Sequence, residues 1–243
     1  MKIAYFECFS GISGDMILGA LIDAGLDFSY LKKELEKLNL KYCDIKAEKM
    51  LKNDISATKF IVIEKNNSNH NKNIKEINSI INKSSLNNKS KLLIKKIFLK
   101  LAEAESKVHN EPIEKIHFHE IGAVDTIIDI AGAVIGLEKL GIKKIYCSKI
   151  NVGSGFVEFS HGKFPVPAPA TAEILKNVPI YSIETEYNAE LTTPTGAAII
   201  TTLAEHFGEM PLMKVEKIGY GAGEKDLKLP NVLKVLIGER KLN

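Results

Sequence analysis

Two histidines and two aspartates stand close together near the middle of the sequence. His117 and His119 are two residues apart, and Asp125 and Asp129 are four residues apart. In an extended segment the two imidazoles point to one face, because side chains alternate along a strand. In a helix the two carboxylates lie one above the other. Imidazoles that converge with carboxylates suit a first-row divalent metal such as Ni, Zn or Fe.

The elements around these residues can bring the four side chains together. We predict an extended segment at 115–119 and a helix at 123–140, with Gly122 permitting a sharp turn between them. Glu120 precedes that turn and, with Asp125, is a candidate general base. A single histidine or a first-turn aspartate is more often structural. The spacing alone therefore leaves metal binding and a structural role about equally open.

Two further histidines are candidate ligands. His109 follows Glu105 by four residues at a predicted helix end, and His161 lies in a Ser-His-Gly turn. The predicted metal ligands are His109, His117, His119, Asp125, Asp129 and His161.

Glycine-containing turns before predicted helices form a second group. Exposed backbone N–H groups at a helix N-terminus can bind an anion. The candidate phosphate-binding residues are Ser10, Gly11, Ser13, Gly14, Thr193 and Gly196. Similar turns occur at 153–155 and 219–223. None has the lysine of a Walker loop or the full GxGxxG pattern, and an ordinary tight turn explains each one taken alone.

The composition is that of a globular protein. The 243 residues are 45% hydrophobic and 26% charged, enough to bury a core without disulfides. The net charge of +3 is not gathered into a basic stripe, so nucleic-acid binding is not expected. No apolar run reaches the roughly 20 residues that span a bilayer. Three scattered cysteines and an N-terminus unlike a signal peptide favour the cytoplasm.

The hydrophobic pattern predicts a mixed α/β (α+β) fold. We expect strand–helix units joined by glycine turns, with mixed sheets flanked by helices. The expected strands are 2–8, 43–51, 57–64, 143–149, 151–159, 211–219 and 231–237. The expected helices include one from Ser13, then 28–38, 88–108, 123–140, one ending near Lys176, and 194–207. The polar stretch 65–73 would separate an N-terminal unit, 1–64, from a main metal-handling part, 74–243.

Six strings identify a resemblance. In order along the chain they are ECFSGISGDM (7–16), HFHEIGAVDTIIDIAGA (117–133), SHGKFPVPAPAT (160–171), LTTPTGAA (191–198), GYGAG (219–223) and PNVL (230–233). Together they resemble the LarC nickel-insertion family.

The resemblance implies a nickel chelatase (insertase) of the lyase class. Its reaction would insert Ni(II) into pyridinium-3,5-bisthiocarboxylic acid mononucleotide in a step that depends on CTP with Mg or Mn. The product, a nickel-pincer cofactor, would serve client enzymes such as lactate racemase, and a homo-oligomer is expected. The resemblance itself assigns no ligands, so the ligand set above is inferred from chemistry.

The sequence departs from the family in two places. Some members have a histidine-rich insertion where 65–73 contains only His70. Full-length members also continue beyond the PNVL string with a part that binds CTP and metal, whereas this sequence ends at Asn243. We therefore expect this chain alone not to bind CTP, and a separate C-terminal polypeptide to supply that part.

Two alternatives stay open. The chain could be a non-catalytic nickel chaperone that lacks its catalytic partner. If the resemblance is set aside, His117, His119, Asp125 and Asp129 could also serve a metal-dependent hydrolase. Formation of the nickel complex from Ni(II), the mononucleotide and CTP, by the chain alone or with a C-terminal partner, would separate insertion from both alternatives.

Overall fold

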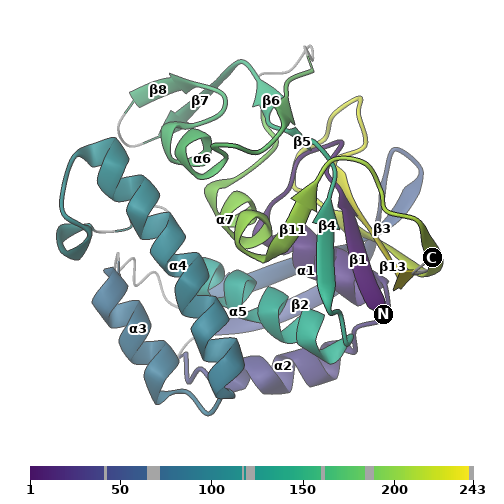
Figure 1. Cartoon of the computed structure of the whole chain (residues 1–243), viewed down its shortest axis with the longest axis horizontal. Helices are drawn as coiled ribbons and strands as arrows, with labels where there is room; N and C mark the ends of the chain where they lie inside the picture. Colours follow the sequence, from purple (N-terminus) through teal and green to yellow (C-terminus); the bar gives the residue numbers. More distant parts are fainter. Residues whose placement is uncertain are drawn as a thin grey trace.

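A mixed seven-stranded sheet organises the molecule (Figure 1). The computed structural model describes residues 1–40, 43–64, 72–116, 118, 124–159, 162–183 and 189–240. The strands of the sheet are β1 (Lys2–Glu7), β2 (Cys43–Lys52), β3 (Ile55–Glu64), β4 (Lys144–Cys147), β11 (Ala204–Phe207), β12 (Met213–Ala222) and β13 (Val232–Arg240). Their order across the sheet is β11-β4-β1-β13-β12-β3-β2.

Strand β1 shows how side-chain alternation builds the sheet. It runs parallel to β4 and antiparallel to β13. Ala4 and Phe6 point into the main core, whereas Ile3 and Tyr5 belong to a small cluster on the opposite face. The sheet combines parallel and antiparallel pairs, which confirms the predicted mixed α/β fold.

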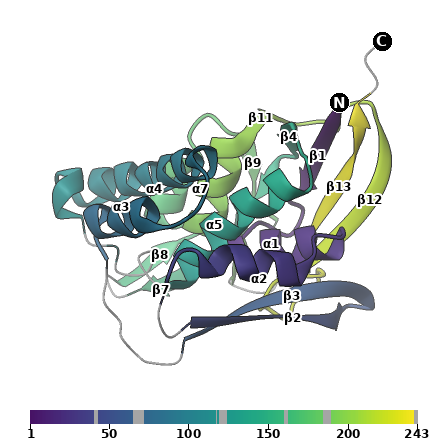
Figure 2. The same ribbon diagram turned by 90° about the horizontal axis from the view of Figure 1, so that it is seen from below.

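Helices cover one face of this sheet. They are α1 (Gly14–Asp23), α2 (Phe28–Glu36), α3 (Ile74–Lys83), α4 (Asn88–His109), α5 (Val124–Lys139), α6 (Pro169–Ile174) and α7 (Pro194–Leu203). Helix α1 packs on β12 and β3 and also against α5, while α4 contacts α3, α5, α6 and α7. Figure 2 shows the sheet curving around α1, with α3 and α4 lying beyond α5. The core therefore lies between the sheet and the layer formed by α1 and α5.

Three two-stranded sheets lie outside the large one. Their strands are β5 (Ile150–Asn151), β6 (Gly153–Ser154), β7 (Phe156–Phe159), β8 (Gly162–Pro165), β9 (Ile180–Tyr181) and β10 (Ala189–Glu190). The single strand predicted at 151–159 is wrong, because Gly153 and Gly155 have positive φ angles of 91° and 81° that interrupt extended backbone.

Two other sequence predictions need correction. The helix predicted at 194–207 ends at Leu203, and 204–207 form β11, which pairs in parallel with β4 at the edge of the sheet. The glycines of the predicted turn at 219–223 largely lie within β12, where α1 crosses closely. An ideal Cβ on Gly221 would lie 1.8 Å from the carbonyl oxygen of Met16. These glycines therefore permit helix–sheet packing.

The segment predicted as a linker falls mostly outside the described residues, which exclude 65–71. The large sheet takes strands from both sides of it, since β2 and β3 precede it and β4, β11, β12 and β13 follow it. The division at 65–73 stays a prediction. No helix in the described ranges is both long enough and apolar enough to cross a membrane.

Candidate functional site

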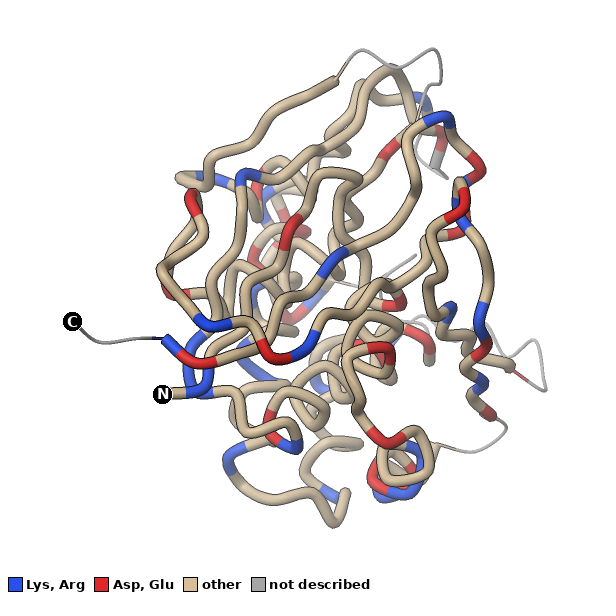
Figure 3. Tube along the Cα trace, turned by 90° about the vertical axis from the view of Figure 1, so that its right-hand side faces the viewer, with Lys and Arg blue, Asp and Glu red and all other residues tan. Residues whose placement is uncertain are grey.

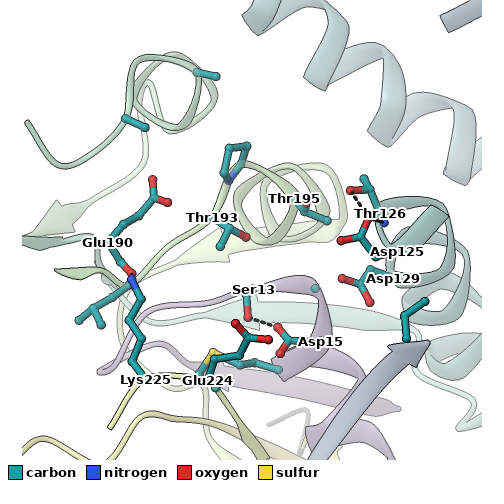
Figure 4. A pocket seen from close by; sticks show the side chains of 18 of the residues that line it. Ser13, Asp15, Asp125, Thr126, Asp129, Glu190, Thr193, Thr195, Glu224 and Lys225 are labelled. Carbon is teal, nitrogen blue, oxygen red and sulfur yellow. Dashed lines mark hydrogen bonds between the residues drawn. The ribbon is translucent and has the colours of Figure 1, made fainter. Parts of the chain in front are cut away.

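A cavity of about 850 Å³ opens where several helix ends meet (Figure 4). The first turns of α1, α5 and α7 contribute to its wall, as do the last turns of α4 and part of β3. A cavity of this size accommodates a ligand as large as a nucleotide. The three helix N-termini add partial positive charge, and their first-turn side chains face the same space.

Six of the residues predicted from sequence line this cavity. They are Ser13, Gly14, His109, Asp125, Asp129 and Thr193. Three others, Ser10, Gly11 and Gly196, do not line it. The remaining four, His117, His119, Glu120 and His161, lie outside the described residues.

The two glycine loops predicted to hold phosphate pack against each other. The Ile12 N–H donates to the Leu191 carbonyl oxygen at 3.0 Å, and the Thr193 N–H donates to the Ile12 carbonyl oxygen at 3.1 Å. Gly11 has a φ of 79°, and an ideal Cβ there would lie 1.9 Å from the Leu191 carbonyl oxygen. Only glycine fits this position. The loop contact places the N-termini of α1 and α7 side by side.

The two N-cap residues differ in what their hydroxyls do. Thr193 Oγ1 accepts a hydrogen bond from the Gly196 N–H at 3.2 Å, which caps α7. Ser13 Oγ donates to the Asp15 carboxylate and makes no capping bond to α1. The N-terminus of α1 thus has backbone donors that its own N-cap side chain does not satisfy.

We expect Thr193→Ala to lower the free energy of unfolding by about 1 kcal/mol, because α7 would lose its side-chain cap. Thr195→Ala is the matched control, since Thr195 also lines the cavity and is not the N-cap residue. Urea denaturation of both variants checks this. An equal loss in the two variants would show that the cap contributes nothing specific.

Three aspartates approach one another at one end of the cavity. Asp125 and Asp129 extend from α5, and Asp15 extends from α1 (Figure 4). Burial raises the pKa of Asp129 well above its usual range, and repulsion from Asp15 and Asp125 raises it further. The Asp129 Oδ1 atom is buried and has no hydrogen-bond partner among the described residues. A buried carboxylate oxygen in this state is suited to receive a cation.

Asp125 is less buried than Asp129. Burial raises the pKa of Asp125, whereas the Thr126 N–H donates to Asp125 Oδ1 at 2.6 Å and partly offsets the increase. At the end of α4, His109 Nε2 lies 3.2 Å from Glu105 Oε2, so the predicted spacing of this pair brings the two side chains into contact.

Several charged residues of the cavity were not predicted from the sequence as site residues. Lys59 on β3 forms an ion pair with Asp15 and lies 3.7 Å from Glu224. Lys225 donates to the backbone carbonyl oxygen of Glu190, and burial lowers its pKa. Asp15 is the last residue of a predicted glycine turn, but the lysines come from segments distant in the chain, so no local spacing indicates them.

The described residues alone do not complete a metal site. Within the described ranges, no group of three or more His, Cys, Asp or Glu side chains is placed to hold a metal. Asp125 and Asp129 nonetheless supply carboxylate oxygens in the cavity, and α5 begins directly after residues 119–123, which lie outside the described residues. Their chemistry fits a divalent cation, and the predicted histidine ligands His117 and His119 stand just before that segment or within it.

Comparison with known proteins identifies one matching family and several similar proteins. The family described as "Nickel insertion protein" matches residues 4–243. A putative nickel insertion protein of Dictyoglomus thermophilum is 51% identical over 239 residues, which cover 98% of this chain and 61% of the relative. No solved structure matches the chain.

Two further relatives carry a more specific name, pyridinium-3,5-bisthiocarboxylic acid mononucleotide nickel insertion protein. The protein of Desulfitobacterium hafniense (strain DSM 10664 / DCB-2) is 51% identical over 98% of this chain and 59% of its own length. The protein of Acetivibrio thermocellus is 48% identical over 99% of this chain and 61% of its own length. The chain thus spans about three fifths of the length of these relatives.

Proposed function

We propose that this chain, which belongs to the nickel insertion protein family, binds Ni(II) and a pyridinium-3,5-bisthiocarboxylic acid mononucleotide in its acid-lined cavity and transfers the metal to the mononucleotide. The observation that carries this proposal is the Asp129 side chain, which lines the cavity and whose buried Oδ1 atom has no hydrogen-bond partner among the described residues. Both nickel and the mononucleotide are substrates of the proposed reaction.

Each wall of the cavity would have a distinct role. Asp125 and Asp129 would hold the metal together with His117, His119, His109 or His161, through ligands that can exchange. The phosphate would lie near the adjacent N-termini of α1 and α7, at Ser13, Gly14 and Thr193. Asp125 or Glu120 would accept the proton that the ring loses when metal replaces hydrogen. In the metal-free protein burial raises the pKa of Asp125.

Insertion and simple nickel delivery can be separated by one assay. The purified chain is incubated with Ni(II), the mononucleotide and CTP with Mg or Mn, and the nickel-containing product is sought by mass spectrometry and absorbance. Product formed by the chain, alone or with a polypeptide corresponding to the rest of the relatives' length, supports insertion. Nickel binding without product in either mixture would identify a chaperone. Failure to bind nickel at all would refute the proposal.

The described cavity does not fit a nucleoside triphosphate. Six carboxylates and two lysines line it, and a triphosphate requires compensating cations. We therefore assign no step in this cavity to CTP. The CTP-dependent part of the reaction, with Mg or Mn, is proposed to involve the length of the relatives that this chain does not span. We also propose that client enzymes use the product and that the protein forms a homo-oligomer.

We expect residues 1–243 to show no saturable binding of CTP at micromolar concentration in calorimetry, because the acidic cavity repels the triphosphate. Titration with Ni(II) under the same conditions should give a saturable signal. Micromolar CTP affinity in residues 1–243, with or without Mg, would contradict this prediction and would place the nucleotide site within this chain.

A further inference from the structure

The charges that line the cavity differ from those of the chain as a whole. The sequence carries a net charge of +3, and Lys and Arg are interspersed with Asp and Glu along the trace (Figure 3). The lining of the cavity instead contains six carboxylates and two lysines. The acidic residues are Asp15, Glu105, Asp125, Asp129, Glu190 and Glu224. The cavity is therefore locally negative although the protein is weakly basic.

Both lysines of the lining are already engaged. Lys59 forms an ion pair with Asp15 and lies near Glu224, and Lys225 donates to the Glu190 carbonyl oxygen. Figure 4 places Lys225 at the opposite side of the cavity from Asp125 and Asp129. Lysines held in this way offset little of the negative charge on the two α5 aspartates.

The substrate named for the relatives is itself rich in negative charge. A mononucleotide carries a phosphate, and two thiocarboxylic acids ionise at neutral pH, so the single positive charge of a pyridinium ring does not balance them. Such an anion entering the metal-free cavity meets a lining of six acidic side chains and only two lysines in a partly desolvated space, where like charges repel strongly. A divalent cation at these carboxylates would reverse the sign of the interaction.

We infer that metal-first binding is favoured, because a divalent metal at Asp125 and Asp129 raises the affinity of the cavity for the anionic mononucleotide. This inference rests on the proposed function and adds the sequence of binding to it. The bound metal neutralises the aspartates and attracts the thiocarboxylates. Because coupling between two binding sites is reciprocal, the mononucleotide then also retains the metal until transfer.

The inference is tested with nicotinic acid mononucleotide as the probe. It carries a pyridinium ring, a carboxylate and a phosphate, and it lacks the sulfur atoms that would bind nickel directly. Its affinity for the full chain is measured by calorimetry in chelator and then with saturating Ni(II). We expect Ni(II) to increase the affinity at least about fivefold, which corresponds to roughly 1 kcal/mol of coupling.

Two variants separate charge from structure. The double variant Asp125→Asn, Asp129→Asn should bind the probe in chelator at least as well as the wild type, and Ni(II) should not change that affinity. Asp54→Asn is the matched control, because Asp54 is exposed in the turn between β2 and β3 and does not line the cavity. It should keep the full response to Ni(II).

The outcomes distinguish this inference from the proposed function. Nickel binding with equal probe affinity in its presence and absence would overturn the binding order and leave the proposed function intact. No nickel binding would overturn both. Weaker probe binding in chelator by a folded double variant, judged by circular dichroism, would show that the aspartates attract the mononucleotide and would also overturn the order.

Discussion

Replacing Asp129 with asparagine is expected to weaken Ni(II) binding at least tenfold and to stabilise the metal-free protein. The loss of affinity, about 1.4 kcal/mol or more, follows from removing a half-buried carboxylate that lines the cavity. The gain in stability follows because burial and repulsion by Asp15 and Asp125 disfavour the ionised form. A substitution of an ordinary surface residue is not expected to weaken nickel binding and stabilise the metal-free protein at the same time.

The gain in stability should depend on pH in a defined direction. Since the pKa of Asp129 is raised in the folded protein, the folded state binds more protons than the unfolded state above about pH 4. Wild-type stability therefore falls as pH rises through this window, and the asparagine variant lacks this fall. The difference in unfolding free energy between the two proteins should therefore increase from about pH 5 to about pH 8.

Urea denaturation in chelator at several pH values checks the stability, and equilibrium dialysis checks nickel binding. Asp54→Asn is again the control, since its exposed side chain should affect neither measurement. A variant that loses stability at every pH, or that binds nickel normally, would show that Asp129 is a structural residue.

The second large effect is expected for the double variant His117→Ala, His119→Ala. Nickel affinity should fall at least tenfold, or about 1.4 kcal/mol, because both residues are predicted ligands in the segment just before α5. His206→Ala is the control, since His206 lies on β11 and does not line the cavity. Unchanged nickel titration in a folded double variant would exclude the two histidines as ligands.

Much of the fold could be predicted from local patterns. The apolar run of β1, the glycine turn before α1 and the Thr193-Pro194 start of α7 all have local causes, and the structure confirms each of them. The end of α7 could not be predicted in this way. Residues 204–207 continue an acceptable helical pattern, but pairing with β4 at the sheet edge outweighs the weak local preference.

The candidate site, like the fold, could be predicted from the sequence only in part. The spacing of Asp125 and Asp129 on a helix placed both carboxylates on one wall of the cavity. The glycines of the two loops were also identified, but their main structural consequence was not, since Gly11 serves the contact with Leu191. A tight turn that binds an anion and a tight turn that packs against another backbone have the same sequence pattern.

Local sequence patterns were enough to predict the family, the helix that carries the two aspartates and the helices whose N-termini surround the cavity. The assembled fold was needed to show that Asp15, Lys59 and Lys225 join them, and that the buried Oδ1 atom of Asp129 has no hydrogen-bond partner among the described residues. The physical reason is the range of the interactions. Helix periodicity and capping act within a few residues, whereas burial and charge in a cavity depend on segments brought together only when the sheet and its helices assemble.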